Sequence, residues 1–205
     1  MKEVLTVPLP NFNDIFDPLP TPPSKENGDM ENYLRERLSN IELLAMDVDG
    51  VLTDGRAIYG PDGFDGVSFN VRDGSSIKWL HRYGIETALI TGRDLGAVRR
   101  RAEVLGIPHL YQGAKVKMES YAQLKEETSL DDDVICYIGD DLPDIPVMRH
   151  AGLSATVADA PGEVKGVADI ITEAPSGGGA ARELAEMLLK AHGHWETLLK
   201  RYFED

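Results

Sequence analysis

Five aspartates follow apolar segments of this chain at spacings that would bring their carboxyl groups together. The segment 41–46 is followed by DVDG at 47–50, and the segment 134–138 by GDDLPD at 139–144. Like charges at short range cannot all stay ionised unless some are protonated or a cation is bound. Hard carboxylate oxygens favour Mg²⁺, which keeps some waters and takes substrate phosphate as a further ligand. The five candidates are Asp47, Asp49, Asp140, Asp141 and Asp144.

A threonine and a lysine stand near the ends of two other apolar segments. Thr91 and Gly92 come directly after residues 85–90, and Lys117 opens the helix expected after residues 109–112. Taken singly, each residue has an ordinary structural role, since aspartates cap turns and lysines are common on helix surfaces. What favours one shared site is the order in which the groups follow successive apolar segments, because this combination is rare. The order is Asp-x-Asp-Gly, Thr, Lys and Gly-Asp-x-x-x-Asp.

These groups suffice for phosphoryl transfer to a carboxylate. Asp47 could attack a phosphoryl group and form an aspartyl phosphate. Attack by one anion on another needs charge neutralisation, which Mg²⁺ and Lys117 would supply. The Thr91 hydroxyl and backbone N–H groups such as that of Gly92 could hold the transferring oxygens. Asp49 could protonate the leaving group and then activate the water that hydrolyses the acyl phosphate.

The elements that must position these residues predict an α/β fold. Short apolar strands alternate with helices, which is typical of a doubly wound, Rossmann-like parallel sheet covered on both faces. Ligands bind such sheets outside the carboxyl ends of the strands. Asp73 is expected to cap the helix that begins at residue 74. We expect strands at 41–46, 85–90, 109–112, 134–138, 153–157 and 168–172, and helices at 30–40, 74–83, 94–105, 115–128, 143–151 and 180–192.

Residues 56–70 interrupt this alternation and predict a small β-hairpin insertion with its turn at 61–63. This hairpin and one helix use most of the interval between Asp47 and Thr91. One helix and one strand use the interval between Thr91 and Lys117. Because no further room is left in either interval, we expect no cap domain.

Composition excludes several classes of function. The 205 residues include 21 Lys and Arg against 35 Asp and Glu, a net charge of −14 that argues against nucleic acid as a partner. The sequence contains no run of about 18 apolar residues, so we expect no membrane partner. The single cysteine and the absence of a signal-like start lead us to expect a cytoplasmic protein. Half of the twelve prolines fall within residues 1–28, where we expect a disordered tail before one domain at 29–205.

The motifs resemble those of the haloacid dehalogenase superfamily of phosphatases over roughly residues 38–192. The likeness is greatest to its 3-deoxy-D-manno-octulosonate 8-phosphate phosphatases, with acylneuraminate 9-phosphate phosphatases as the alternative. The resemblance implies a Mg²⁺-dependent phosphoric monoester hydrolase that acts on a small phosphorylated sugar acid in lipopolysaccharide precursor synthesis. The matching stretches are DVDGVLTDG at 47–55, FNVRDG at 69–74, LITGR at 89–93, HLYQG at 109–113, YIGDDLPDIPVM at 137–148 and VADA at 157–160.

The resemblance also implies roles for the acidic residues and the lysine. Asp47 would be the nucleophile, Asp49 the acid and base, and Lys117 would pair with Asp47 and the phosphoryl oxygens. Mg²⁺ would be held by Asp47, Asp140 and the backbone carbonyl of Asp49. The supporting carboxylates would be Asp141 and Asp144, the latter positioning Lys117.

Substrate binding is implied for Thr91, Gly92 and Arg72, the last in the motif near the substrate entrance. Two positions depart from the family pattern. Ser76 stands where Arg-Asp-Gly-x-Gly has its second glycine, and Gly178 stands where Gly-Gly-Arg-Gly-Ala has its arginine. The core motifs are intact, so these departures bear on the choice of sugar acid rather than on the reaction.

Two hypotheses of another class remain beside the enzyme. A phosphorylation-switched receiver module also combines a parallel sheet with an acidic pair, an acceptor Asp, a Thr and a Lys, but it places the acidic pair first and the Lys last. A catalytically idle relative could act only through interactions, although the complete set of acidic groups argues against it.

An open site without a cap must still exclude water from an acyl phosphate. The resemblance implies a homotetramer assembled through hairpins like that at 56–70. The hairpin has more apolar residues than a lone surface hairpin needs. These residues are Ile58, Tyr59, Phe64, Val67 and Phe69.

Overall fold

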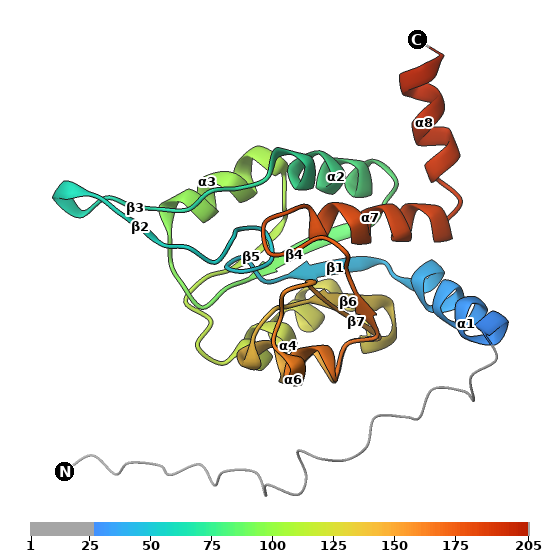
Figure 1. Ribbon diagram of the computed structural model, residues 1–205, viewed down its shortest axis with the longest axis horizontal. Coiled ribbons are helices and arrows are strands. Elements are labelled where there is room, and N and C mark those ends of the chain that lie inside the picture. Colours follow the sequence, from blue (N-terminus) through green and yellow to red (C-terminus); the bar gives the residue numbers. More distant parts are fainter. Residues whose placement is uncertain (1–26, 205) are drawn as a thin grey trace, which may run out of the picture.

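Six parallel strands form the central sheet of the computed structural model, which describes residues 27–204 (Figure 1). Their order is β5-β4-β1-β6-β7-β8. Numbered along the chain, this order is 3-2-1-4-5-6, the doubly wound Rossmann arrangement, whereas receiver-like folds have the order 2-1-3-4-5. The predicted fold class is therefore confirmed. The strands are β1 (Leu43–Met46), β4 (Glu86–Ile90), β5 (His109–Tyr111), β6 (Ile135–Ile138), β7 (Leu153–Thr156) and β8 (Ile170–Ile171).

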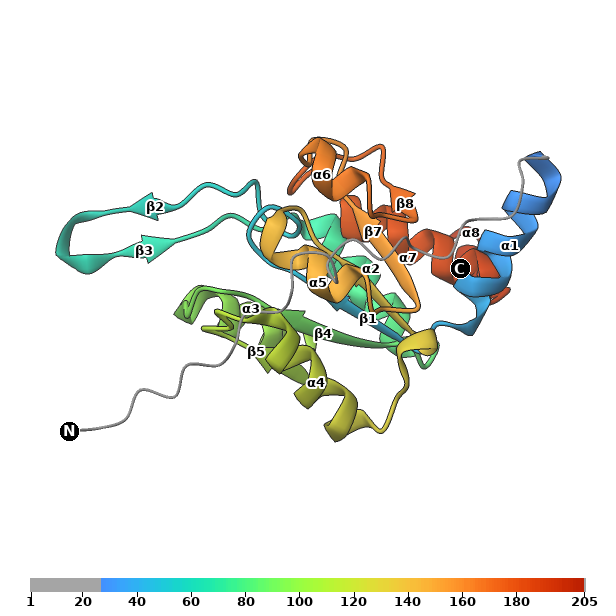
Figure 2. The ribbon, with the colours of Figure 1, turned by 90° about the horizontal axis from the view of Figure 1, so that it is seen from below.

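Helices cover both faces of this sheet (Figures 1 and 2). One face carries α2 (Val71–Arg82), α3 (Gly96–Leu105) and α7 (Ala180–Ala191), and the other carries α4 (Lys117–Thr128), α5 (Ile145–Met148) and α6 (Gly162–Lys165). Every residue of β1, β6 and β7 is buried, because both sides of each strand lie under helices. The short 3₁₀ turns are Pro61–Gly63, Asp132–Val134 and Leu142–Asp144.

The first and last helices lie at the edge of this body. α1 (Asn27–Asn40) is fixed by Arg37, which pairs with Asp169 at 2.7 Å, and α8 (Trp195–Phe203) projects away from the sheet (Figure 1). Because α1 begins at Asn27, the last two residues of the expected tail lie in this helix, and residues 1–26 lie outside the described residues. No helix within residues 27–204 is long and apolar enough to cross a membrane.

The predicted hairpin is present and extends away from the sheet (Figure 2). β2 (Ile58–Tyr59) pairs antiparallel with β3 (Asp65–Gly66), and Tyr59 lies opposite Asp65. Ile58, Tyr59 and Phe64 are exposed, whereas Val67 and Phe69 pack against the core. The second arm is thus shorter than expected. The hairpin, α2 and β4 are the elements between Asp47 and Thr91, so the prediction that no cap is inserted there holds.

The segment that follows the hairpin joins α2 to α7. Asn70, not Asp73, caps α2: its side chain accepts from Arg72 N at 2.8 Å and donates to Gly177 O at 3.1 Å. Asp73 lies in the first turn, 2% exposed, and accepts from the backbone N–H of Arg182 at 2.8 Å. Its other oxygen is buried and has no partner among the described residues.

Burial raises the pKa of Asp73 to about 6, although the Arg182 backbone and nearby arginines partly oppose this shift. A carboxyl whose pKa is higher in the folded than in the unfolded state lowers the free energy of unfolding when it ionises. This loss of stability grows as the pH rises from the unfolded pKa, about 4, to the folded pKa, and it stays constant at higher pH. The ionised Asp73 is therefore a net cost to stability at neutral pH.

We predict that Asp73→Asn raises the free energy of unfolding by about 2 kcal/mol at pH 8 and by about half as much at pH 5. The amide keeps the acceptor for Arg182 N but carries no charge. Urea denaturation at both pH values checks this, with the exposed Asp131→Asn as the control. A variant less stable than the parent at pH 8 would contradict the prediction.

Candidate active site

A cleft of about 410 Å³ opens at the carboxyl ends of the central strands, where the strand order reverses between β1 and β6. Its walls come from the segments that follow β1, β4, β5 and β6. The lining residues are Asp47, Asp49, Gly55, Gly92, Arg93, Ala114, Lys115, Lys117, Asp140, Asp141, Pro143 and Asp144. The fold thus brings the carboxylates predicted from the sequence to one place.

Lys117 joins two of these carboxylates at the floor of the cleft. Its Nζ lies 2.9 Å from Asp47 Oδ1 and 2.6 Å from Asp144 Oδ1. All three side chains are buried, with 7%, 5% and 0% of Lys117, Asp47 and Asp144 exposed. Because Lys117 begins α4 and Asp47 directly follows β1, the ion pair also fixes this helix against the sheet.

Asp144 is satisfied at both oxygens. Tyr137 Oη donates to Oδ1 at 2.5 Å, and the backbone N–H groups of Asp140 and Asp141 donate to Oδ2 at 3.2 Å each. Gly139 makes room for this, since a Cβ there would lie 2.3 Å from Asp144 Cγ. Tyr137 is a site residue that sequence analysis missed, because within an apolar strand it resembles any other core aromatic.

Burial and the neighbouring charges shift the pKa values of the site. Burial, and then the charge of Asp144, raise the pKa of Asp47 well above its ordinary value. The same causes raise the pKa of Asp140 to about 6. Burial alone would lower the pKa of Lys117, but Asp47 and Asp144 outweigh it and raise that pKa. The lysine therefore stays charged, and it does not by itself offset the cost of ionising Asp47 and Asp140.

The residues fit a divalent cation. Oxygens of Asp47, Asp140 and Asp144 lie within 4.8 Å of one another. Asp144 is engaged by Lys117, Tyr137 and backbone N–H groups, so Asp47 and Asp140 are the carboxylates that remain for the ion. Asp140 Oδ1 is buried without a partner among the described residues, as expected of a ligand oxygen. The Asp49 carbonyl stays a prediction as the third protein ligand.

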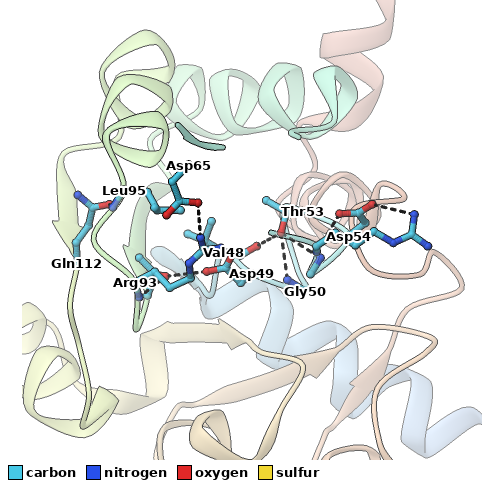
Figure 3. Close-up of polar contacts among 12 residues, drawn as sticks. Val48, Asp49, Gly50, Thr53, Asp54, Asp65, Arg93, Leu95 and Gln112 are labelled. Carbon is cyan, nitrogen blue, oxygen red and sulfur yellow. Dashed lines mark hydrogen bonds and ion pairs between the residues drawn. The ribbon is translucent and has the colours of Figure 1, made fainter. Parts of the chain in front are cut away.

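Asp49 lies at the wall of the cleft, beside Arg93 (Figure 3). Its Oδ1 accepts from Arg93 at 3.2 Å, and its Oδ2 is 3.5 Å from the Thr91 hydroxyl, which is fully buried. Thr53 closes the loop after Asp49, since its hydroxyl accepts from Gly50 N and donates to Val48 O, both at 3.3 Å (Figure 3). Arg93 lies in the quoted LITGR stretch, yet nothing in its spacing or its neighbours along the chain selects it as a site residue.

Of the remaining predicted residues, some line the cleft and others do not. Gly92 lines the cleft, and Asp141 lines it too while capping the 3₁₀ turn through Leu142 N at 2.8 Å. Arg72 is exposed in the first turn of α2 and is not among the residues that line the cleft. Ser76 is buried and donates to Asp73 O at 2.8 Å, so its hydroxyl serves α2 rather than the cleft.

Comparison with known proteins shows the family to which the chain belongs. A family model described as haloacid dehalogenase-like hydrolase matches residues 71–152. The 3-deoxy-D-manno-octulosonate 8-phosphate phosphatase KdsC of Salmonella typhi is 42% identical over 166 residues, which are 81% of this chain and 88% of that protein. The chain belongs to the haloacid dehalogenase-like hydrolases. The enzyme of the same name from Escherichia coli strain K12 is 44% identical over 77% of this chain and 84% of its own.

A solved structure of this hydrolase family has the same fold. It is the 3-deoxy-D-manno-octulosonate 8-phosphate phosphatase of Moraxella catarrhalis, in complex with a magnesium ion, a phosphate ion and a KDO molecule. The two chains are 37% identical, with a TM-score of 0.82 over 83% of this chain and 98% of that one. Family membership and sheet order together argue against the receiver hypothesis.

We predict that Gly50→Ala weakens Mg²⁺ binding at least tenfold, because a Cβ at this position, where φ is +93°, would lie 2.0 Å from Asp140 Oδ2 and displace that carboxylate. Titration calorimetry with Mg²⁺ measures the affinity. Gly96→Ala is the control, since a Cβ there meets nothing within 4 Å, and it should bind like the parent. Equal affinity of both variants would exclude Asp140 as a ligand.

Proposed function

We propose that this hydrolase is a Mg²⁺-dependent phosphatase that cleaves 3-deoxy-D-manno-octulosonate 8-phosphate, a step of lipopolysaccharide precursor synthesis, through an aspartyl phosphate on Asp47. The observation that carries the proposal is the buried Lys117 held between Asp47 and Asp144 at the floor of the cleft. It orients one carboxylate oxygen and neutralises charge where a phosphate would enter. The names of the relatives at 42–44% identity support the choice of substrate.

The side chains divide the work of two displacements. Asp47 attacks phosphorus, the ester P–O bond breaks, and Asp49 gives a proton to the departing alkoxide. Asp49 then takes a proton from water, which attacks the acyl phosphate, so inorganic phosphate leaves and the Asp47 carboxylate is restored. Lys117 and the N–H groups around Gly92 hold the phosphoryl oxygens. Mg²⁺, held by Asp47 and Asp140, would supply further charge neutralisation.

An acylneuraminate 9-phosphate or another small phosphosugar is the alternative substrate. Gly178, where the family commonly has arginine, packs on Pro175, since a Cβ there would lie 2.8 Å from its ring. A side chain at this position would need the turn to move. A panel of phosphorylated sugar acids assayed side by side, comparing kcat/KM, decides between these substrates.

We predict that Asp47→Asn lowers kcat by at least about a thousandfold, because an amide oxygen cannot replace the attacking carboxylate. Release of phosphate from the preferred sugar acid phosphate is the measurement. Asp54→Asn is the matched control in the same DVDGVLTDG stretch, with its side chain 45% exposed in a surface pair with Arg56, and it should stay within about threefold. If the activity of Asp47→Asn stayed within tenfold of the parent, Asp47 would be excluded as the nucleophile.

A homotetramer built through the hairpins is the assembly we propose for this enzyme. Ile58, Tyr59 and Phe64 are 50%, 76% and 59% exposed on one projecting hairpin, which is costly for a monomer. Mutual burial of these side chains would also bring neighbouring chains toward the open cleft. Location in the cytoplasm stays a prediction.

Tyr59→Asp is expected to dissociate the assembly and to lower activity with it, since a charge would enter the apolar contact. Phe69 is unsuited to this test, because it packs on the core beneath Arg101, and its replacement would disturb folding. Light scattering with parallel assays measures both effects. Val104→Asp, exposed on α3, controls for added surface charge. A parent enzyme that is fully active as a monomer would refute the proposed assembly.

A further inference from the structure

Arg93 connects the wall of the active site to the hairpin. One guanidinium nitrogen lies 3.2 Å from Asp49 Oδ1, and the other lies 2.8 Å from Asp65 Oδ1 (Figure 3). Asp49 belongs to the loop after β1, and Asp65 belongs to β3. The side chains of Arg93, Asp49 and Asp65 are 29%, 23% and 36% exposed. Arg93 and Asp49 line the cleft, whereas Asp65 is not among its lining residues, so Arg93 connects the cleft wall to the hairpin.

The backbone that carries Arg93 is fixed from three directions. Arg93 N donates to the Thr91 hydroxyl at 3.4 Å, and Arg93 O accepts from Gly113 N at 3.2 Å. Two residues on, Leu95 N donates to the Gln112 side chain at 3.1 Å (Figure 3). The guanidinium therefore extends from a rigid loop, and its planar fork holds two carboxylates in one geometry.

Asp49, in contrast, has little else to orient its carboxylate. The Thr91 hydroxyl is 3.5 Å from Oδ2, at the outer limit of a hydrogen bond, whereas the arginine contact is shorter and charge-assisted. A general acid must be held at hydrogen-bond distance from the atom that it protonates. Among the contacts of the described residues, that with Arg93 is the one suited to hold it.

We propose that Arg93 is a positioning residue for Asp49, and that Asp65 positions Arg93 in turn, so that the hairpin and the acid–base group are mechanically linked. The inference rests on the proposed phosphatase function. Asp65 lies opposite Tyr59 in the hairpin. A displacement of the hairpin would therefore move the carboxylate that holds the second guanidinium nitrogen of Arg93.

The leaving group provides a direct test. An alkyl alkoxide needs a proton as the P–O bond breaks, whereas an aryl oxide is stable enough to leave with little help. The ratio kcat/KM covers the steps through the first bond cleavage, so it isolates the acid step. A variant whose Asp49 is misplaced should lose more kcat/KM on an alkyl phosphate than on an aryl phosphate.

The experiment compares the full chain with Arg93→Ala and Arg93→Lys on three substrates: an aryl phosphate, a sugar phosphate without a carboxylate, and 3-deoxy-D-manno-octulosonate 8-phosphate, which has one. We expect Arg93→Ala to lower kcat/KM about a hundredfold on the sugar phosphate and less than tenfold on the aryl phosphate. Lysine can reach one carboxylate but cannot bridge two, so Arg93→Lys should recover part of the loss. Circular dichroism and thermal unfolding check that both variants fold.

Asp65→Asn tests the second half of the link. It should lower kcat/KM on the sugar phosphate severalfold in the parent and have no further effect in Arg93→Ala, because the two residues act in series. Asp62→Asn, exposed at the tip of the same hairpin, is the matched control. Additive effects of the two substitutions would overturn the link to the hairpin.

Other outcomes separate the ways in which the proposal could fail. Equal losses on both esters would show that Arg93 has no special role in the acid step and would overturn the inference alone. A rise in KM confined to substrates with a carboxylate would assign Arg93 to substrate binding instead and would also overturn it. A parent enzyme that releases no phosphate from any of the three substrates would refute the proposed function, and the inference with it.

Discussion

The ion pairs of Lys117 with Asp47 and Asp144 are the interaction on which the rest of the site depends. Moving a lysine and two carboxylates out of water is costly, and their attraction offsets this cost only where the remaining polar atoms are also satisfied. Asp144 meets that condition through Tyr137 and two backbone N–H groups. With Asp140 added, three carboxylates face one lysine, and the surplus of two negative charges is what a divalent cation would balance.

The doubly wound sheet provides this concentration of charge without strain in the strands. β1 and β6 are neighbours, so the residues that follow them, Asp47 and Asp140, leave the sheet side by side at the point where the strand order reverses. Close approach is then a question of space. Gly50 and Gly139 lie where any Cβ would collide with Asp140 or Asp144. The glycines of the two motifs are therefore as necessary to the site as its carboxylates.

The six strands and the convergent acids could be predicted from the sequence. Short apolar runs that end in polar residues and alternate with helices are typical of buried parallel strands. Prediction failed where a residue's role depends on a distant partner. Asp73 has the usual features of a helix cap, but the contact that defines it is the backbone of α7, more than a hundred residues away. Tyr137 and Arg93 likewise act on Asp144 and Asp49, and strand and motif patterns contain no information about those contacts.

The hairpin combines two kinds of residue in one short insertion. Its apolar residues Ile58, Tyr59 and Phe64 face solvent, whereas Asp65 of the same strand pair binds Arg93. A purely apolar insertion would serve association only, and a purely polar one would leave the cleft open. Because the same strand pair carries both the exposed Tyr59 and, opposite it, Asp65, contact between subunits would bear on Asp49 through a single arginine. A chain without a cap domain could in this way make its acid–base geometry depend on its assembly.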